Sequence, residues 1–194
     1  MRPYLFVKRA GDIVLSAAAA LILLPFLPVA ALVIKLDSPG PVFFTQRRVG
    51  KDKRIFKLYK FRTMRTDAPK DTPTHLLSGA RAHITPLGAF MRRASIDELP
   101  QLVNILRGDM SIVGPRPALW NQDDLVAERG KYGANGVRPG LTGLAQVMGR
   151  DELPIPQKAA YDGQYVAELG FLSDCRIVMK TFAGVIAGKG VVDS

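Results

Sequence analysis

The sequence predicts a mixed α/β protein that is rich in helices, with one small β-hairpin, an N-terminal re-entrant membrane helix and interfacial helices. Three observations support this prediction. A long uncharged apolar segment lies near the N-terminus, two short aromatic runs follow it, and helical patterns fill much of the second half. A chain of 194 residues suits one substantial core, so we expect a membrane hairpin at residues 1–36 and a single globular domain at residues 37–194.

The apolar segment runs from Ile13 to Ile34, 22 residues without a charge, and as a helix it would extend about 33 Å, enough to cross a bilayer. Pro25 and Pro28 each remove a backbone donor, so we expect a kink or break there. Because basic residues flank both ends, a re-entrant hairpin with both ends in the cytoplasm fits better than a straight span. A cleaved signal peptide or a buried core helix fits less well, since the segment is long and lacks a polar face.

The positive charge is concentrated at the N-terminus. The net charge is +10, and residues 1–65 hold 13 Lys and Arg against 3 Asp and Glu, whereas residues 66–194 hold 14 against 14. Beside an apolar segment, this asymmetry favours an anionic membrane surface over nucleic acid. The single cysteine, Cys175, excludes an intrachain disulfide and suits a reducing compartment.

The globular part begins after the Pro- and Gly-containing turn at residues 37–41. Residues 41–46 and 54–61 are short apolar and aromatic runs on either side of the basic stretch 47–53, which predicts a β-hairpin. Residues 66–88 contain three prolines and show no clear period, so we expect a loop there.

Helical signals return in the second half. Pro100 suits the first position of a helix that ends at a Gly108 cap, and a polar helix is expected at residues 121–132. Five glycines in residues 133–149 indicate a tight loop that a ligand or another backbone approaches closely. Two further helices are expected, at residues 156–169 and 173–187.

The strongest chemical signal is the acid pair Asp97 and Glu98, which follows Arg92 closely. A carboxylate can attack phosphorus only when arginine, lysine or a divalent metal neutralises the substrate's negative charge. Glu98 also completes a Ser-x-x-Glu capping box that starts at Ser95. If the helix begins at Pro100, the acid pair lies instead at its N-terminus, where anions are favoured. The residues alone leave catalysis and capping both open.

Other basic residues could neutralise a phosphate. Four arginines lie near glycine or proline, and rigid backbone there suits bidentate phosphate recognition: Arg92, Arg116, Arg138 and Arg150. Lys60 and Arg62 interrupt an aromatic-rich strand. The alternative for any single arginine is ordinary surface solvation.

Several common classes of site are not indicated. His75 and His83 have no helical or Cys/His companion, so zinc is not expected. The sequence has no Gly-x4-Gly-Lys-Ser/Thr phosphate loop, no dinucleotide-binding glycine motif after a strand and no Gly-x-Ser-x-Gly elbow. These absences argue against the common nucleotide hydrolases, dinucleotide enzymes and serine hydrolases.

Ordered motifs cover nearly the whole chain. They are KRAGD at residues 8–12, PVFFTQRRVG at 41–50, YKFRTM at 59–64, RRASIDELPQ at 92–101, MSIVGPRP at 110–117, RPGLTG at 138–143 and YDGQYV at 161–166. Together they resemble the bacterial sugar transferases, the monotopic phosphoglycosyl transferases that load a phosphosugar onto polyprenol phosphate. Two positions depart from the family pattern, because Met148 replaces a common asparagine and Leu24 replaces the serine of a Ser-Pro helix break.

The resemblance implies that Asp97 attacks the β-phosphorus of a UDP-sugar, releases UMP and holds the phosphosugar until polyprenol phosphate accepts it. It implies that Asp97 and Glu98 are catalytic and that both are candidate ligands of the cofactor Mg²⁺. The implied substrate-binding residues are Lys60, Arg62, Arg92, Arg116, Arg138, Gln146, Arg150 and Asp174. A structural pairing of Asp174 with an arginine is the alternative for that residue.

On this interpretation, residues 37–194 form a cytoplasmic catalytic domain at the inner membrane of a bacterium, acting at the first membrane step of glycoconjugate biosynthesis. The expected partners are a UDP-sugar, polyprenol phosphate and membrane lipid, without nucleic acid, and a homodimer is left open. Two alternatives remain, a non-catalytic membrane adaptor that binds anionic lipid and a metal-dependent phosphohydrolase that transfers to water.

Overall fold

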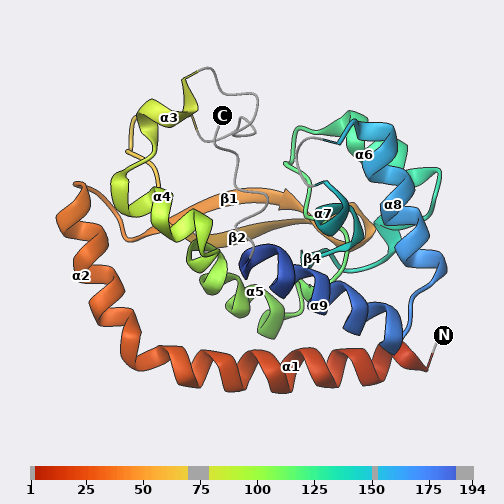
Figure 1. Cartoon of the computed structure of the whole chain (residues 1–194). Coiled ribbons are helices and arrows are strands. Elements are labelled where there is room, and N and C mark those ends of the chain that lie inside the picture. The colour runs from red at the N-terminus through yellow and green to blue at the C-terminus, as the bar shows by residue number, and fades with distance from the viewer. Residues whose placement is uncertain (1–2, 70–78, 150–152, 187–194) are drawn as a thin grey trace.

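The computed structural model describes residues 3–69, 79–149 and 153–186, which form a helix-rich mixed α/β structure with two small sheets, as Figure 1 shows. In chain order its elements are α1 (Tyr4–Leu23), η1 (Leu24–Phe26), α2 (Leu27–Asp37), β1 (Phe43–Val49), η2 (Lys51–Lys53), β2 (Ile55–Phe61), α3 (Ala80–His83), α4 (Pro86–Arg93), η4 (Ile96–Gln101), α5 (Leu102–Arg107), β3 (Ser111–Val113), α6 (Asp123–Gly130), η5 (Ala134–Gly136), β4 (Gly140–Thr142), α7 (Leu144–Met148), α8 (Ile155–Ala167) and α9 (Phe171–Ile186).

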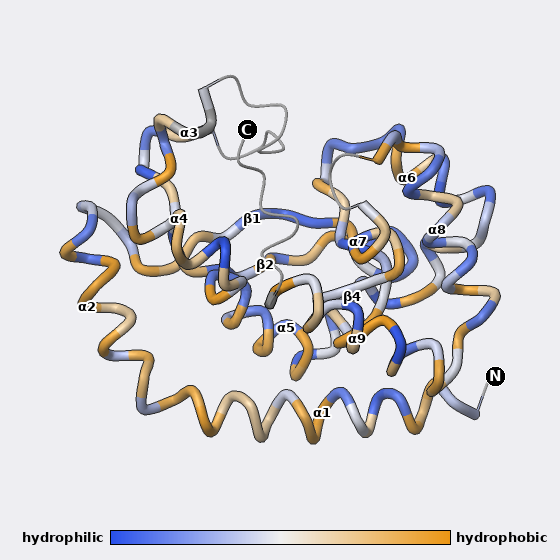
Figure 2. Tube along the Cα trace, in the orientation of Figure 1, coloured by the Kyte–Doolittle hydropathy of each residue, from blue (hydrophilic) through white to orange (hydrophobic). Residues whose placement is uncertain are grey.

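The apolar segment is helical and breaks where the prolines predict. Pro25 lies in η1 and Pro28 in the first turn of α2, so the 3-10 turn η1 separates the two α-helices. Figure 1 shows α1 along one side of the domain and α2 turning away from it towards the hairpin, and both are largely apolar in Figure 2. Residues Tyr4–Asp37 are long and apolar enough to cross a membrane, and nearly all of this apolar stretch is exposed.

The predicted β-hairpin is confirmed. β1 and β2 pair antiparallel, with Phe43 opposite Phe61 and Val49 opposite Ile55. Leu58 of β2 is buried with Ile105 and Met110. Phe61 at the end of the strand forms a separate core cluster, which includes Ile34 of α2 and Met91 of α4. The hairpin therefore holds both the end of the apolar segment and the helices that follow.

A second sheet was not predicted. β3 and β4 pair in parallel, and their strands of three residues are too short to show a periodicity in sequence. The glycines of the predicted tight loop allow this pairing. A Cβ on Gly140 would lie 2.1 Å from the backbone N of Gly114, and a Cβ on Gly143 would lie 2.1 Å from the Gly114 carbonyl oxygen. Of the two alternatives for these glycines, close approach of another backbone is what the structure contains.

Two boundaries differ from expectation. Part of the predicted loop at residues 66–88 is helical, because α3 lies there and α4 begins at Pro86, where the Thr85 hydroxyl caps the helix by accepting from the Gly88 N–H at 3.0 Å. A Thr-Pro pair is a recognised helix start, so this signal was present in the sequence. Residues 70–78 lie outside the described residues.

The helix predicted to begin at Pro100 begins earlier, as η4 at Ile96. Ser95 adopts a left-handed backbone with φ of 56°, and its side chain makes no capping hydrogen bond, so the capping box is not formed. The predicted helices at residues 121–132, 156–169 and 173–187 correspond to α6, α8 and α9. Tyr165 of α8 and Ile177 of α9 form a third core cluster with Val113 of β3, and α6 packs against α8, where Arg129 donates to Asp162 at 2.8 Å.

Candidate active site

The acid pair lies in the first turn of η4, immediately after a sharp change of chain direction at Ser95. The N–H of Ser95 donates to the Arg92 carbonyl at 3.1 Å, and the N–H of Glu98 donates to the Ser95 carbonyl at 3.3 Å. These two short-range bonds join α4 to η4. Asp97 is buried, with 6% of its surface exposed. Two carboxylates are therefore held on consecutive tight turns rather than ahead of a regular helix.

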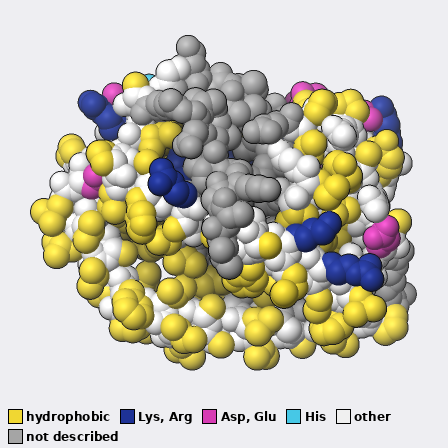
Figure 3. All heavy atoms as spheres, viewed as in Figure 1, with side chains coloured by type: hydrophobic (Ala, Val, Ile, Leu, Met, Phe, Trp, Pro, Cys, Tyr) yellow, Lys and Arg dark blue, Asp and Glu magenta, His cyan; other side chains and the backbone are white. Residues whose placement is uncertain are grey.

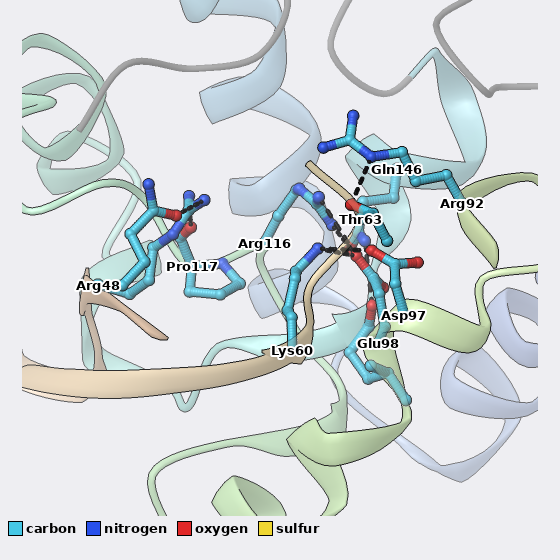
Figure 4. A network of polar contacts seen from close by, with 11 residues as sticks. Arg48, Lys60, Thr63, Arg92, Asp97, Glu98, Arg116, Pro117 and Gln146 are labelled. Carbon is cyan, nitrogen blue, oxygen red and sulfur yellow. Dashed lines mark hydrogen bonds and ion pairs between the residues drawn. The ribbon is translucent and has the colours of Figure 1, made fainter. Parts of the chain in front are cut away.

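Lys60 of β2 approaches both carboxylates, as Figure 4 shows. Its Nζ lies 2.7 Å from Oε1 of Glu98 and 3.7 Å from Oδ2 of Asp97. The Glu98 contact is a hydrogen-bonded ion pair, while the Asp97 contact is longer and mainly electrostatic. The lysine that interrupts the aromatic strand is thus a cation beside the acid pair.

Arg116 comes from the segment that follows β3. Both terminal nitrogens of its guanidinium lie 3.4 Å from Oε1 of Glu98. Prolines on either side of Arg116 restrict its backbone, and the neighbouring Pro117 carbonyl accepts a hydrogen bond of 2.9 Å from Nη1 of Arg48. The hairpin therefore fixes the segment that carries the second cation of the site.

Arg92 supplies a third cation from the last turn of α4. Its Nε donates a hydrogen bond of 2.9 Å to Oγ1 of Thr63. Burial lowers the pKa of Arg92, and the negative charges of Asp97 and Glu98 act in the opposite direction. An arginine stays protonated at neutral pH even so, and this one lies in the electrostatic field of both carboxylates.

The two carboxylates differ in their proton affinity. Burial alone would raise the pKa of Glu98, but the charges and hydrogen bonds of Lys60 and Arg116 outweigh it and lower that pKa to about 2. Burial raises the pKa of Asp97, Lys60 opposes this, and the adjacent charge of Glu98 raises it further. Glu98 is therefore the fixed negative charge of the pair, and Asp97 is the group whose charge is least compensated.

The two carboxylates of the acid pair are ligands of the type that a Mg²⁺ ion shares with substrate phosphates. Among the described residues, no group of three or more His, Cys, Asp or Glu side chains could hold a metal by itself. Mg²⁺ is commonly bound by one or two carboxylates, with substrate phosphates and water as its other ligands. Asp97 and Glu98 are two such carboxylates, and the ammonium of Lys60 shows that a cation is stabilised between them.

Gln146, another predicted substrate-binding residue, lies on α7, and its Nε2 donates to the Leu141 carbonyl at 3.1 Å. Its Oε1 is buried and makes no hydrogen bond in the structure. Exchanging the two amide atoms would bring two acceptors together, so the orientation follows from the Leu141 contact. Figure 4 shows this side chain in the same network as Arg92 and Thr63. Arg150, predicted for the same role, lies outside the described residues.

Two arginines that were predicted to bind substrate, Arg62 and Arg138, donate to backbone carbonyls. Arg62 is buried and donates to the C-terminal end of α2 and the turn after it, with bonds of 2.7 Å to the Ser38 carbonyl, 3.1 Å to that of Pro39 and 2.6 Å to that of Pro41. Arg138 donates from Nε to the Gly108 carbonyl at 2.8 Å, just after α5. Neither arginine contacts the acid pair among the described residues, because helix-terminal carbonyls attract their guanidinium groups.

Asp174, predicted to bind substrate, lies at the contact between α9 and α1. It accepts hydrogen bonds of 2.6 Å from Tyr4, 2.6 Å from Lys8 and 2.9 Å from Tyr165. Its cationic partner is Lys8 of α1 and not an arginine. Among the described residues, these contacts are of the kind that the structural alternative for Asp174 predicts. Nearby, Asp12 accepts a hydrogen bond from the Ser111 hydroxyl at 2.7 Å, which fastens α1 to β3.

Sequence reasoning missed two residues that shape the site, Thr63 and Arg48. Both lie inside motifs quoted for the family, at residues 59–64 and 41–50. The sequence does not indicate a supporting role for either residue. A threonine that accepts a hydrogen bond from a distant arginine has the same local sequence pattern as any other threonine. Only the fold brings Thr63 to Arg92 and Arg48 to Pro117.

Comparison with known proteins connects this geometry to a family. The model of the family described as "Bacterial sugar transferase" matches residues 3–188. The match includes the apolar segment, the hairpin and the acid pair.

Three curated relatives illustrate the range of similarity. "Exopolysaccharide production protein PSS" of Rhizobium leguminosarum bv. phaseoli is 43% identical over 199 residues, 96% of this chain and 98% of the relative. "UDP-glucose:undecaprenyl-phosphate glucose-1-phosphate transferase" of Caulobacter vibrioides is 43% identical, over 92% of this chain and 69% of the relative. "UDP-N-acetylgalactosamine-undecaprenyl-phosphate N-acetylgalactosaminephosphotransferase" of Aeromonas hydrophila is 37% identical, over 96% of this chain but only 45% of the relative.

Proposed function

Because the chain belongs to the bacterial sugar transferase family, we propose that it transfers a sugar-1-phosphate from a UDP-sugar to polyprenol phosphate and releases UMP. The observation that carries this proposal is the buried acid pair with Lys60, Arg92 and Arg116 around it. A diphosphate donor brings negative charge to a carboxylate, and attack is possible only where cations compensate both. The names of two relatives give undecaprenyl phosphate as the acceptor and a UDP-sugar as the donor.

We assign Asp97 as the nucleophile. Its carboxylate oxygen forms a bond to the β-phosphorus, the bond from that phosphorus to the bridging oxygen breaks, and UMP leaves with the electron pair. A phosphate oxygen of polyprenol phosphate then attacks the same phosphorus, and the bond to Asp97 breaks. This second step restores the carboxylate and yields the polyprenyl diphosphosugar. No proton has to be transferred in either step, which suits a site whose acid pair, among the described residues, makes its ion pairs with lysine and arginine and not with histidine.

Glu98 has a different role in this proposal. Its low pKa keeps it ionised, and its ion pairs with Lys60 and Arg116 orient both cations towards the place where phosphate binds. Asp97 and Glu98 would hold Mg²⁺ together with the diphosphate. The metal would supply further neutralisation of phosphate charge when bound.

We further propose that residues 1–36 form a re-entrant membrane hairpin and that residues 37–194 form the catalytic unit on the cytoplasmic face of the inner membrane. The contacts at the two ends of the apolar segment support a re-entrant hairpin, because both ends pack against the catalytic unit. Near the N-terminal end, Lys8 pairs with Asp174, and Arg9 donates to the Ile105 carbonyl at 2.6 Å. At the other end, Arg62 holds the carbonyl of Ser38. A straight span would separate these ends by the thickness of the bilayer.

Exposed apolar side chains outside this segment support interfacial helices. α9 exposes more than 60% of Phe171, Leu172, Met179 and Phe182, and their spacing places them along one side of the helix. Cys175 is exposed between them, so it lies on the apolar side of the C-terminal helix. Figure 3 shows hydrophobic side chains gathered over α1 and α2 at the edge of the molecule. We propose that α9 rests in the headgroup region beside α1, which would bring a lipid phosphate and a soluble nucleotide to one carboxylate.

The test is UMP release by the purified full chain in detergent or lipid nanodiscs, with Mg²⁺, a panel of UDP-sugars, and with and without undecaprenyl phosphate. The panel includes UDP-glucose and UDP-N-acetylgalactosamine, the donors that the relatives' names print. We expect sugar-selective release that lipid stimulates and that Asp97→Asn abolishes, while Asp123→Asn on the surface of α6 is unaffected. Release without lipid transfer would favour a phosphohydrolase. No release from any donor with lipid binding intact would favour a membrane adaptor.

A further inference from the structure

Thr63 contacts α4 at both of its ends. The Thr63 carbonyl accepts a hydrogen bond of 3.1 Å from the N–H of Thr85, the residue that caps the start of α4. A Cβ on Gly88 would lie 2.1 Å from the same carbonyl oxygen, so the first turn of α4 packs directly on the Thr63 backbone. At the other end of α4, the Thr63 hydroxyl accepts from Arg92. Thr63 therefore contacts both the start of α4 and the Arg92 side chain near its end.

The contact with Thr63 determines how the guanidinium of Arg92 is presented. A guanidinium is planar, so a hydrogen bond at Nε restricts the plane and direction of the two terminal nitrogens. Nε donates to Thr63 at 2.9 Å, and the structure gives neither terminal nitrogen a hydrogen bond to another described residue. Those two nitrogens form a fork whose donors match two phosphate oxygens.

Thr63 is well suited to hold this orientation. It is buried, with 6% of its surface exposed, so little water competes for its hydroxyl. Its β-branched side chain has few rotamers, and its backbone follows β2, the strand that carries Lys60. Thr63 lies three positions after Lys60 in the sequence and binds Arg92, so the positions of the two cations depend on the same short segment.

We propose that Thr63 is a positioning residue that orients the guanidinium fork of Arg92 towards the diphosphate of the nucleotide substrate. This inference rests on the proposed function for the identity of the substrate, and it assigns to Thr63 no contact with the reacting atoms. The hydroxyl acts through Arg92, so its loss matters only while Arg92 is present.

The first measurement is the affinity of the full chain in detergent for UDP with Mg²⁺, by calorimetry, which needs no turnover. Thr63→Val keeps the shape and removes the acceptor, and we expect about tenfold weaker UDP binding. Thr63→Ser keeps the hydroxyl and should bind within about twofold of wild type. Thr181→Val is the matched control, because the Thr181 hydroxyl is hydrogen-bonded to the Ile177 carbonyl of α9 and to the Thr142 hydroxyl of β4. Equal UDP binding by wild type and Thr63→Val would overturn the inference.

The second measurement separates positioning from general structure. In an Arg92→Lys background the fork is gone, so adding Thr63→Val should cause no further loss of UDP affinity. In steady-state UMP release, Thr63→Val should raise KM for the UDP-sugar about tenfold and change kcat by less than about threefold. A loss of equal size in both backgrounds would assign Thr63 a purely structural role and overturn the inference. If Thr63→Val weakens UDP binding but the wild type releases no UMP from any UDP-sugar, the proposed function is overturned and the positioning role of Thr63 is not.

Discussion

The ammonium of Lys60 donates to Oε1 of Glu98 at 2.7 Å. Its distance to Asp97 is a full ångström longer, at 3.7 Å. This asymmetry contributes to the opposite shifts of the two carboxylates. Burial raises the pKa of Asp97, whereas at Glu98 the charges and hydrogen bonds of Lys60 and Arg116 outweigh burial and lower the pKa to about 2. The better compensated carboxylate organises the cations, and the less compensated one remains available to attack.

Asp97→Asn is expected to inactivate the protein and to stabilise it. Loss of the nucleophile should lower UMP release by at least about a thousandfold. Because the folded-state pKa of Asp97 is raised, its ionised form costs free energy at neutral pH, and the neutral amide removes that cost. Thermal unfolding should move upward, by about 2–4 °C for each kcal/mol in a chain of this size. An unchanged or lower midpoint, beside a neutral Asp123→Asn control, would mean that the Asp97 charge is net stabilising.

Glu98→Gln is expected to have the opposite effect on stability. A pKa lowered to about 2 means that ionised Glu98 stabilises the fold, and one pKa unit is about 1.4 kcal/mol, so the loss should be roughly 3 kcal/mol at pH 7. This contribution is fully present above the unfolded-state pKa of about 4.3 and disappears as the pH falls through the folded-state value. Denaturant unfolding of both proteins at pH 7 and near pH 3 provides the check. A difference that stays constant with pH would assign the effect to packing instead of charge.

The pH dependence of UMP release should follow Asp97. The nucleophile must be ionised, and a raised pKa shifts the fall in activity to higher pH than an ordinary aspartate would give. Glu98 stays ionised over the same range, so one ionisation should describe the acid side of the kcat/KM profile. Lys60→Gln removes a charge that lowers the pKa of Asp97, and it should move this ionisation to still higher pH. A profile that Lys60→Gln does not shift would contradict the assignment.

Local signals in the sequence were enough to predict the hairpin, the break at Pro25 and the three later helices, since each has its own pattern of apolar, turn or proline residues. The β3–β4 sheet was out of reach, because its strands are too short for any period and their pairing depends on contact between distant glycines. The start of η4 was predicted wrongly because Pro100 occupies the interior of a 3-10 turn, which tolerates it, and not the first helical position.

The predicted site residues also fall into two groups, those that lie near the acid pair and those that bind backbone carbonyls elsewhere. Lys60, Arg92 and Arg116 were expected near the acid pair, and the structure brings them there. Arg62 and Arg138 belong to the same residue type and occupy similar motifs, yet they bind carbonyl groups at the ends of α2 and α5. Nothing local distinguishes the two kinds of arginine, because the difference lies in which helix end the fold places beside each guanidinium.

Arg62→Lys is expected to loosen the apolar segment. A lysine keeps the charge but cannot reach the carbonyls of Ser38, Pro39 and Pro41 together, so we expect a loss of about 2–4 kcal/mol in unfolding free energy. Protease sensitivity of the chain between α2 and β1 should rise in parallel. Arg93→Lys, an exposed arginine of α4, serves as the control and should be neutral. A variant with wild-type stability and a raised KM for the UDP-sugar would contradict this structural role and favour the substrate-binding role predicted for Arg62.

Gly140→Ala tests whether the glycine-rich stretch serves backbone packing. A Cβ at this position would lie 2.1 Å from the Gly114 N and 2.3 Å from the Thr142 carbonyl oxygen, and neither backbone atom can move without separating β3 from β4. We expect more than about 3 kcal/mol of destabilisation, measured by unfolding in detergent. Gly136→Ala is the matched control, since a Cβ there meets nothing within 4 Å, and it should change stability by less than about 0.5 kcal/mol. Equal stability of the two variants would show that β3 and β4 can separate at little cost and would contradict the assignment of Gly140 to backbone packing.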